Sequence, residues 1–453
     1  MDIREPFALP PDVKMVLDTL EAAGFEAFIV GGCVRDRLLG KSPHDWDICT
    51  NAQPGEIIAC FGKNRIIPTG ITHGTVTLIA PEMPLEITTY RVDGRYLDSR
   101  HPEQVNFTGL LQEDLARRDF TVNAMAYSPT RGLIDLFGGR EDLAHGILRT
   151  VGSPKERFEE DALRILRLFR FEAKLDFTPE PETLAGAIIC RDGLSHISWE
   201  RKAAELSAIL LSPYPRKGLE RMIETGAMEF VLPEWAPCRG FDQRNHHHSL
   251  LLDEHILKTV ECSPCSLVER LCMLCHDLGK PQSFTTSQDG EGHFYGHAEI
   301  GEEITRTALT RLRYPTALVE RVARLVGLHS ITLEPNPRQL RRLLSKLGEE
   351  GVHQLLEVQK ADTMAKAPRY IQPRLKVLAA AQRTLEEIIA AKHCISLSDL
   401  KVDGNRLMAA LGLPPGPEIG KLLQALLAQV LEDPSMNEEQ VLLETAKRLK
   451  GDD

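Results

Sequence analysis

The first 150 residues alternate short apolar runs with turn-forming residues, which is typical of strands and helices around one sheet. The run FEAFIV leads directly into Gly31-Gly32, and residues 75–80 and 85–90 are rich in types that favour strands. From Phe158 onward, leucine and isoleucine adopt helical spacing, as in EEDALRILRLFRFEAKL. We therefore predict an α+β protein with an N-terminal mixed-sheet head followed by mainly α-helical domains.

Breaks rich in proline, glycine and polar residues interrupt the helical half at 233–245, 365–373 and 412–420. A chain of 453 residues contains several domains of the usual size of about 100–200 residues. We predict four parts, residues 1–150, 151–240, 241–365 and 366–453.

The chain contains no run approaching the roughly 18 apolar residues of a membrane span, and its first residues lack the pattern of a signal peptide. Together with ten cysteines, this predicts a cytoplasmic protein with reduced thiols and no membrane partner. Cys262-x-x-Cys265 and Cys272-x-x-Cys275 are separated by six residues, whereas a zinc ribbon leaves about 15–20. We interpret them as core thiols, with a metal or redox site as the alternative.

Asp45 and Asp47 are the sharpest feature of the N-terminal half. Residues two apart on a strand point to the same face, so both carboxylates can share a pair of divalent cations. Glu86 lies in a later predicted strand and is a candidate third carboxylate. Two cations held in this way would contact the attacking and leaving oxygens of a phosphoryl transfer. The alternative is an ordinary solvated strand end.

The preceding segment GGCVRD favours a nucleotide site. Gly31 and Gly32 lie between a predicted strand and a predicted helix, where backbone amides can bind phosphate oxygens. Arg35 adds a cation suited to bidentate contact with phosphate. A tight turn with an Arg–Asp surface pair is the alternative, but the glycines, the arginine and the two aspartates fall within 17 residues.

Four runs resemble a known family in its order and spacing: GGCVRDRLLG…DWDICT, RRDFTVNAMAY, DLFGGREDL and EEDALRILRLFRF. The family is the class II tRNA nucleotidyltransferases, or CCA-adding enzymes, with bacterial poly(A) polymerases as close relatives. The resemblance covers residues 20–220. It implies a nucleotidyltransferase head, a helical neck that recognises the base, and addition of CCA to tRNA from CTP and ATP with Mg²⁺.

The resemblance also implies roles for single residues. Asp45 and Asp47 would hold the catalytic metals, with Glu86 as a further catalytic carboxylate. Asp119 would accept a hydrogen bond from the ribose 2′-hydroxyl, and Asp161 and Arg164 would bind the base edge. From the residues alone, Asp161 and Arg164 would instead form a helix salt bridge. The implied nucleotide-binding residues are Gly31, Gly32, Arg35, Arg118, Asp119, Asn123, Asp161, Arg164 and Arg167.

Residues 89–107 resemble the flexible loop of enzymes that add all three nucleotides, which favours CCA addition over CC addition. A poly(A) polymerase or A-adding enzyme stays open. An RNA-binding phosphohydrolase with an inactive head is another open alternative, although the retained Asp45 and Asp47 argue against it.

A second set of metal-binding residue types lies between residues 246 and 362. His276-Asp277 followed by Leu-Gly-Lys resembles the HD superfamily of metal-dependent phosphohydrolases, which implies a binuclear transition-metal site of unidentified metal and substrate. Lys280 would contact a phosphate, and we interpret the triple histidine 246–248 as a solvated helical turn. Any single histidine here is more often a packed or surface residue. The implied metal ligands are His255, His276, Asp277, His297, His329 and Asp362.

Acidic residues (65) outnumber basic ones (54), and the resulting net charge of −11 excludes a protein that coats nucleic acid indiscriminately. Basic residues concentrate at 162–174 and 338–346, so we predict an RNA partner bound at chosen phosphates. Residues 401–437 resemble the C-terminal tRNA-binding region of the same family, with a simple helical packing domain as the alternative. The sequence leaves the oligomeric state open.

Overall fold

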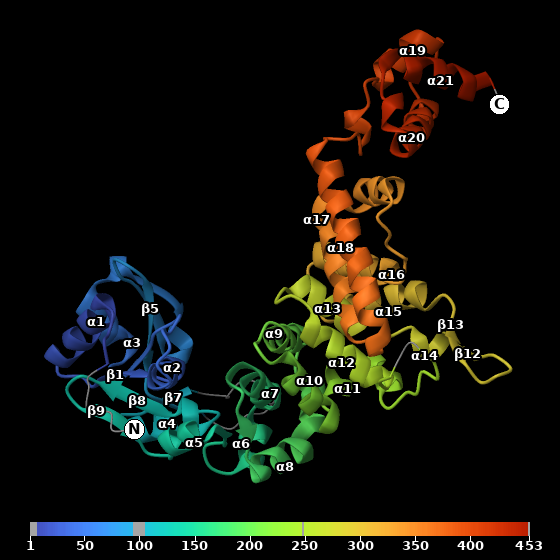
Figure 1. Ribbon diagram of the computed structural model, residues 1–453. Helices are drawn as coiled ribbons and strands as arrows, with labels where there is room; N and C mark the ends of the chain where they lie inside the picture. The colour runs from blue at the N-terminus through green and yellow to red at the C-terminus, as the bar shows by residue number, and fades with distance from the viewer. Residues whose placement is uncertain (1–6, 94–104, 247–248, 452–453) are drawn as a thin grey trace. The chain divides into compact units, whose positions relative to one another are not determined.

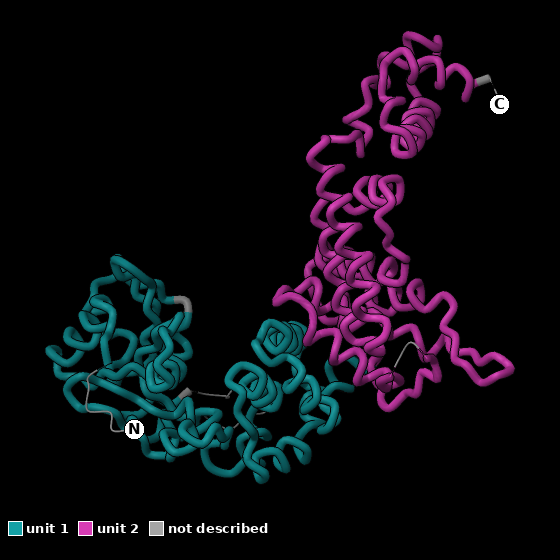
Figure 2. The backbone as a smooth tube through the Cα atoms, in the orientation of Figure 1, with its two compact units in different colours: residues 1–233 teal, residues 234–453 magenta. Residues whose placement is uncertain are grey.

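A computed structural model describes residues 7–93, 105–246 and 249–451. The chain forms two compact units, residues 1–233 and 234–453 (Figure 2). Their boundary falls at the start of the predicted break at 233–245. The finer division into four parts stays a prediction.

The first unit is built on a seven-stranded sheet in the order β3-β4-β5-β2-β1-β8-β9 (Figure 1). Strands β2 and β5 are parallel and the other neighbours are antiparallel, which confirms the predicted mixed sheet. The strands are β1 (Ala27–Val30), β2 (Asp47–Thr50), β3 (Ile66–Gly70), β4 (Thr75–Ile79), β5 (Pro84–Thr89), β8 (Met125–Ser128) and β9 (Gly132–Asp135). Two short ribbons pair β6 (Arg91–Asp93) with β7 (Val105–Phe107) and β10 (Ile147–Leu148) with β11 (Thr178–Pro179).

The first unit also contains helices, some between the strands of the sheet in sequence and the others after the last of these strands. They are α1 (Pro11–Ala22), α2 (Gly32–Leu38), α3 (Pro54–Phe61), α4 (Leu111–Ala116), α5 (Gly139–His145), α6 (Pro154–Glu160), α7 (Leu163–Leu175), α8 (Pro181–Cys190), α9 (Trp199–Leu210), α10 (Pro215–Glu224) and α11 (Met228–Val231). One buried core cluster joins Phe28 and Val30 of β1 to Cys49 of β2 and Leu115 of α4. This packing supports the chain segments that carry the candidate site.

Two predictions need correction. Strand β2 begins at Asp47, so Asp45 precedes the strand instead of lying in it. The helix predicted from Glu159 onward is interrupted at Asp161, whose backbone is extended (φ −144°, ψ 102°) between α6 and α7. The spacing of apolar side chains does not reveal a helix break that is only one residue long.

The second unit is almost entirely helical and contains one small hairpin of β12 (Phe284–Thr286) and β13 (Gly292–Phe294). Its helices are α12 (Leu252–Cys262), α13 (Leu267–Cys275), α14 (Lys280–Ser283), α15 (His297–Arg311), α16 (Thr316–Leu328), α17 (Pro337–Met364), α18 (Pro368–Ala390), α19 (Gly404–Leu411), α20 (Pro417–Glu432) and α21 (Glu439–Gly451). Helices α19, α20 and α21 share a separate apolar cluster that includes Leu407, Leu426 and Leu442.

Cys272 and Cys275 are fully buried in α13, where burial raises the pKa of the Cys275 thiol to about 12. Both are therefore packed as small apolar residues. Cys262 is half-buried and Cys265 is exposed, so the core-thiol interpretation is wrong for Cys265. Among the described residues, no helix combines the length and the apolar character needed to cross a bilayer.

Candidate functional site

Two carboxylates lie opposite each other at the start of strand β2, and a third is close enough to act on them electrostatically. Asp47 is directly opposite Glu86 of the parallel strand β5, so the two side chains lie on one face. Asp45 precedes Asp47 by two residues. The pKa of Asp47 is raised by burial of its carboxyl, although the residue keeps an exposed surface; Arg118 opposes this effect, while Glu86 and Asp45 add to it. Divalent cations would offset this repulsion, so Asp47 and Glu86, with Asp45 nearby, are candidate metal ligands.

Gly31 brings the backbone close to this group. Its φ is 79°, and a Cβ at this position would lie 3.0 Å from Nη1 of Arg118 and 4.0 Å from Oδ2 of Asp47. Glycine is therefore favoured by the positive φ, and any side chain here would press against the Arg118 guanidinium. Gly32 follows as the first residue of α2.

Arg118 lies beside these carboxylates, and its guanidinium does not use all of its N–H donors. Its Nη2 donates to Oδ2 of Asp114 at 3.2 Å, whereas its buried Nε has no hydrogen-bond partner among the described residues. A phosphate oxygen would satisfy such a donor. The phosphate contact of Arg118 stays a prediction.

A chain of hydrogen bonds joins the Gly-Gly turn to helix α7. Nη1 of Arg35 donates to Oδ1 of Asn123 (2.6 Å), and Nδ2 of Asn123 donates to Oδ1 of Asp119 (3.1 Å). Nε of Arg167 then donates to Oδ2 of Asp119 (2.8 Å). Arg35 is buried and also pairs with Asp36 at 2.7 Å. Four of the predicted nucleotide-binding residues are thus mutually fixed.

This network predicts an acid-sensitive contribution to stability. Burial would raise the pKa of Asp119, but Arg167 and Asn123 outweigh it and lower the pKa to about 2. Because the folded-state pKa lies below the unfolded one, the stabilisation is present above about pH 4 and is lost as the pH falls towards about 2. We expect it to amount to about 2 kcal/mol at neutral pH. Urea unfolding should show Asp119→Asn losing less stability than wild type over this range; parallel losses would contradict the prediction.

Asp161 and Arg164 are held by different partners. Oδ2 of Asp161 accepts a hydrogen bond from Nη2 of Arg201 at 2.8 Å. Arg164 donates to the backbone carbonyls of Arg157 (2.9 Å) and Arg117 (3.1 Å) and pairs with Glu160. The helix salt bridge between Asp161 and Arg164 therefore does not form, because the helix begins only after Asp161.

Sequence reasoning missed the residues that fix these side chains. Asp114 is fully buried and accepts from Nε of Arg117 at 3.0 Å as well as from Arg118; burial alone would raise its pKa, but the two arginines lower it. Its position three and four residues before these arginines was an available signal. Arg201 and Glu205 of α9 lie about 40 residues from their partners Asp161 and Arg170, so no local pattern reveals them.

The predicted basic track at 162–174 is largely internal. Arg167 and Arg170 pair with Asp119 and Glu205, because arginines on the apolar face of a buried helix require acidic partners. In the second track, at 338–346, buried Arg341 donates to the carbonyl of Leu431 at 2.7 Å. Within that track, Arg338 and Arg342 are exposed but lie beside Glu432.

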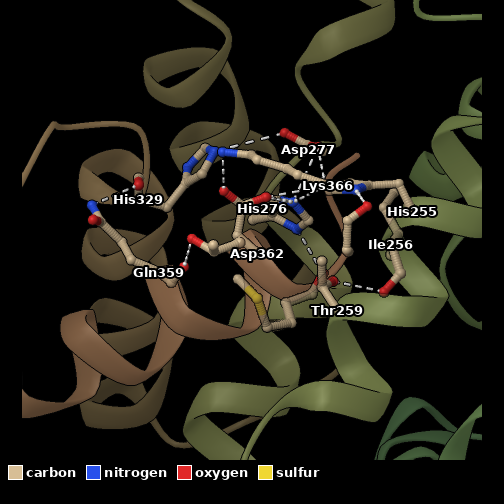
Figure 3. Close-up of polar contacts among 12 residues, drawn as sticks. His255, Ile256, Thr259, His276, Asp277, His329, Gln359, Asp362 and Lys366 are labelled. Carbon is tan, nitrogen blue, oxygen red and sulfur yellow. Dashed lines mark hydrogen bonds and ion pairs between the residues drawn. The ribbon is translucent and has the colours of Figure 1, made fainter. Parts of the chain in front are cut away.

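A second cluster gathers four histidines and two aspartates in the helical unit, and Figure 3 labels all of them except His297. Each comes from a helix or helix end, and α13 packs against α12, α16 and α17. His255 lies in α12, His276 and Asp277 follow α13, His297 begins α15, His329 follows α16, and Asp362 lies in the last turn of α17. The structure thus brings together all six predicted metal ligands.

Asp277 is the centre of this cluster. Its Oδ2 lies 3.0 Å from Nε2 of His276 and 3.4 Å from Nε2 of His255, whereas its Oδ1 lies 3.6 Å from Nε2 of His329 and 3.7 Å from Nε2 of His297. Oδ1 of Asp362 is 3.2 Å from His255. The two oxygens of Asp277 therefore face two separate histidine pairs, as in a carboxylate that bridges two metals.

The histidine tautomers support metal binding. Nδ1 lies 2.8 Å from the carbonyl oxygen of Met273 in His276, 2.7 Å from that of Phe294 in His297 and 2.6 Å from that of Val326 in His329. A carbonyl accepts only from a protonated nitrogen, so a neutral ring presents the lone pair of Nε2 to the cluster. The Nε2 atoms of His297 and His329 are 3.3 Å apart, as are those of His255 and His276. Facing lone pairs repel one another unless a cation lies between them.

Basic residues surround the same cluster. Lys280 is buried and lies 2.8 Å from Oδ2 of Asp277, and Lys366 lies 2.8 Å from Oδ2 of Asp362. Both lysines, together with Arg374, line a cavity of about 530 Å³ that reaches Asp277, His297, His329 and Asp362. The site can therefore receive an anion next to the metal ligands.

Two predicted segments fall wholly or partly outside the described residues. They are residues 94–104 of the loop at 89–107, and His247 and His248 of the triple histidine. The remaining histidine, His246, lies 2.5 Å from Oε1 of Glu291 through Nδ1.

Three family models match this chain. One, described as the poly(A) polymerase head domain, matches residues 27–149, and one described as the probable RNA and SrmB-binding site of polymerase A matches residues 176–239. The third, a putative tRNA nucleotidyltransferase domain 2, matches residues 283–446.

Full-length relatives are similar over almost the whole chain. The CCA-adding enzyme of Streptococcus suis is 35% identical over 95% of both chains, and that of Pediococcus pentosaceus is 32% identical over 98% of both. A crystal structure of the Bacillus stearothermophilus CCA-adding enzyme in complex with CTP covers 98% of this chain and 100% of its own, with 27% identity and a TM-score of 0.74.

Proposed function

We infer that this chain, which belongs to the CCA-adding enzymes, adds C, C and A to the 3′ end of tRNA from CTP and ATP at the site in its head. The observation that carries the placement of the site is the pairing of Asp47 with Glu86 across β2 and β5. Asp45, Gly31 and Arg118 lie beside this pair.

In the proposed reaction, the 3′ oxygen of tRNA forms a bond to the α-phosphorus, the bond to pyrophosphate breaks, and the hydroxyl proton is released. Asp45 and Asp47, with Glu86 as a third carboxylate, would hold a divalent cation such as Mg²⁺. When bound, this cation stabilises charge on the attacking and leaving oxygens. The guanidinium of Arg118 would bind a phosphate oxygen of the nucleotide.

Base selection is assigned to Asp161 and Arg164. A carboxylate accepts a hydrogen bond from the exocyclic amine of cytosine or adenine, and a guanidinium donates to a ring nitrogen or carbonyl. Uracil and guanine present the wrong complement. Arg201 would hold the Asp161 carboxylate in position, and Asp119 would accept from the ribose 2′-hydroxyl.

Asp161→Ala is expected to relax base selection. Because each well-formed base contact contributes roughly 1–3 kcal/mol of discrimination, the ratio of kcat/KM for CTP over UTP should fall about tenfold or more. Single-nucleotide incorporation into a tRNA lacking its CCA end measures this ratio. The control is Asp176→Ala, which removes an exposed carboxylate at the end of α7 that pairs with Lys217. An unchanged ratio in Asp161→Ala would contradict the assignment.

We further propose that the cluster around Asp277 is a binuclear metal site with phosphohydrolase activity. The facing Nε2 atoms, the two-sided contacts of Asp277 and the adjacent lysines support this proposal. His255, His276 and Asp362 would hold one transition metal, His297 and His329 the other, and Asp277 both. When bound, the metals supply an activated water and offset phosphate charge. Lys280 and Lys366 would orient the phosphate.

A further inference from the structure

Phe171 of helix α7 lies at the centre of a group of three arginines. Its ring is buried, and the guanidinium carbons of Arg35, Arg167 and Arg170 lie 5.3, 5.5 and 4.9 Å from the ring centroid. The ring of Phe120 meets it edge to face, with the centroids 5.7 Å apart and an angle of 82° between the planes. A guanidinium within about 6 Å of an aromatic centroid is attracted by the ring quadrupole, so all three arginines make cation–π contacts with Phe171.

Three cations around one ring repel one another, and the structure offsets each of them with a carboxylate. In each of these ion pairs at least one side chain is buried, which holds the guanidiniums in place before any substrate binds. The ring of Phe171 is therefore the contact that three ion pairs have in common. The pairs join Arg35 to Asp36, Arg167 to Asp119 and Arg170 to Glu205.

The three arginines belong to parts of the chain that carry different sections of the candidate nucleotide site. Arg35 lies in α2, which begins within the Gly31-Gly32 turn. Arg167 and Arg170 lie in α7, which begins directly after Asp161 and its neighbour. The ring of Phe171 thus connects the turn predicted to bind phosphate with the helix start predicted to read the base.

Burial by itself does not account for an aromatic residue at this position. Phe169 is fully buried in the same helix, and among the residues that the structure describes no cation lies over its ring. Leucine would replace the apolar volume of either phenylalanine at a similar cost in packing. At Phe171 it would also leave three guanidiniums without the ring face that attracts them. Comparing the two positions therefore separates the packing of a ring from its attraction for cations.

Resting on the proposed site in the head, we propose that Phe171 is a positioning residue of nucleotide addition. Its ring holds the start of α7, with Asp161 and Arg164, in a fixed place relative to α2 and the Gly31-Gly32 turn. A nucleotide bound to both sides then presents its α-phosphate in line with the attacking 3′ oxygen. The ring acts through the arginines, without touching the substrate. Since a misplacement of about 1 Å can lower a rate by up to about a hundredfold, loss of this alignment slows the addition step.

The test replaces Phe171 by phenylalanine analogues that carry increasing numbers of fluorine atoms. Fluorine withdraws electron density from the ring face, so the attraction for a cation weakens stepwise while the ring nearly keeps its size and shape. We expect kcat for CTP addition to a tRNA lacking its CCA end to fall stepwise, by about tenfold over the series. KM for CTP should change by less than about threefold, because the groups that bind the nucleotide are retained and only their alignment is lost. Phe171→Leu should show at least the full loss.

Phe169 supplies the matched control. The same fluorinated series at Phe169 should leave kcat within about twofold of wild type, and thermal unfolding of every variant is measured in parallel. Equal falls in kcat at both positions would show that the ring of Phe171 serves packing alone and would overturn the proposal. A Phe171 series that loses thermal stability and keeps its kcat would overturn it as well.

The result is independent of the test of base selection. If Asp161→Ala leaves the preference for CTP over UTP unchanged but fluorination at Phe171 lowers kcat, the base assignment is wrong and the positioning role stands. If Asp161→Ala relaxes base selection but fluorination at Phe171 leaves kcat unchanged, the positioning role is wrong and the base assignment stands.

Discussion

Replacing Asp45 and Asp47 together by alanine is expected to reduce nucleotide incorporation into tRNA by at least about a thousandfold. Asp47 lies opposite Glu86, and the negative charges of Glu86 and Asp45 act on it, which supports the proposal that the three residues bind a divalent cation. Without them, nothing offsets the charge that develops on the attacking and leaving oxygens. Incorporation of labelled CTP into a tRNA lacking its CCA end measures the effect.

The matched control is Glu82→Gln, which removes an exposed carboxylate from the turn before β5. It should leave incorporation within about twofold of wild type, since a surface carboxylate away from the site contributes little. Circular dichroism is used to check that the double variant is folded. Substantial incorporation by the folded double variant would show that the catalytic metals are held elsewhere.

His276→Ala is expected to lower the affinity for a transition metal at the helical cluster by at least about a hundredfold and to abolish phosphate release there. His276 is fully buried, and its Nε2 lies 3.0 Å from Asp277 and 3.3 Å from Nε2 of His255. CCA addition should persist, because the residues assigned to it lie in the first compact unit. Metal content after dialysis against Mn²⁺ and phosphate release from ribose 5-phosphate measure the two losses.

The corresponding control is His353→Ala, which removes a half-buried histidine of α17 that is not a member of the cluster. It should retain both the metal and the hydrolysis. If His276→Ala binds as much metal as wild type, the cluster is a packed group of histidines and the phosphohydrolase proposal fails.

The elements that the sequence predicted best have local causes. Strands β1, β4 and β5 follow from short β-branched and aromatic runs, and the family motifs locate the head residues. The break at Asp161 and the inward-facing arginines of α7 were not predictable, because their causes are partners from elsewhere in the chain. Arg201 and Glu205, which hold Asp161 and Arg170, lie about 40 residues later.

For the metal cluster, too, the residue types were predictable from the sequence and their orientation was not. The residue types and their order suggested metal ligands. The sequence does not reveal which ring nitrogen of each histidine faces the cluster. That depends on the backbone carbonyls of Met273, Phe294 and Val326, which fix the rings of three histidines.

The most direct test of the central claim is the 3′-end sequence of a tRNA lacking CCA after incubation with CTP alone, ATP alone, or both. CTP alone should add two cytidines, ATP alone should add nothing to the unextended end, and the two together should give CCA and stop. A run of adenosines from ATP alone, or no extension under any of the three conditions, would contradict the account.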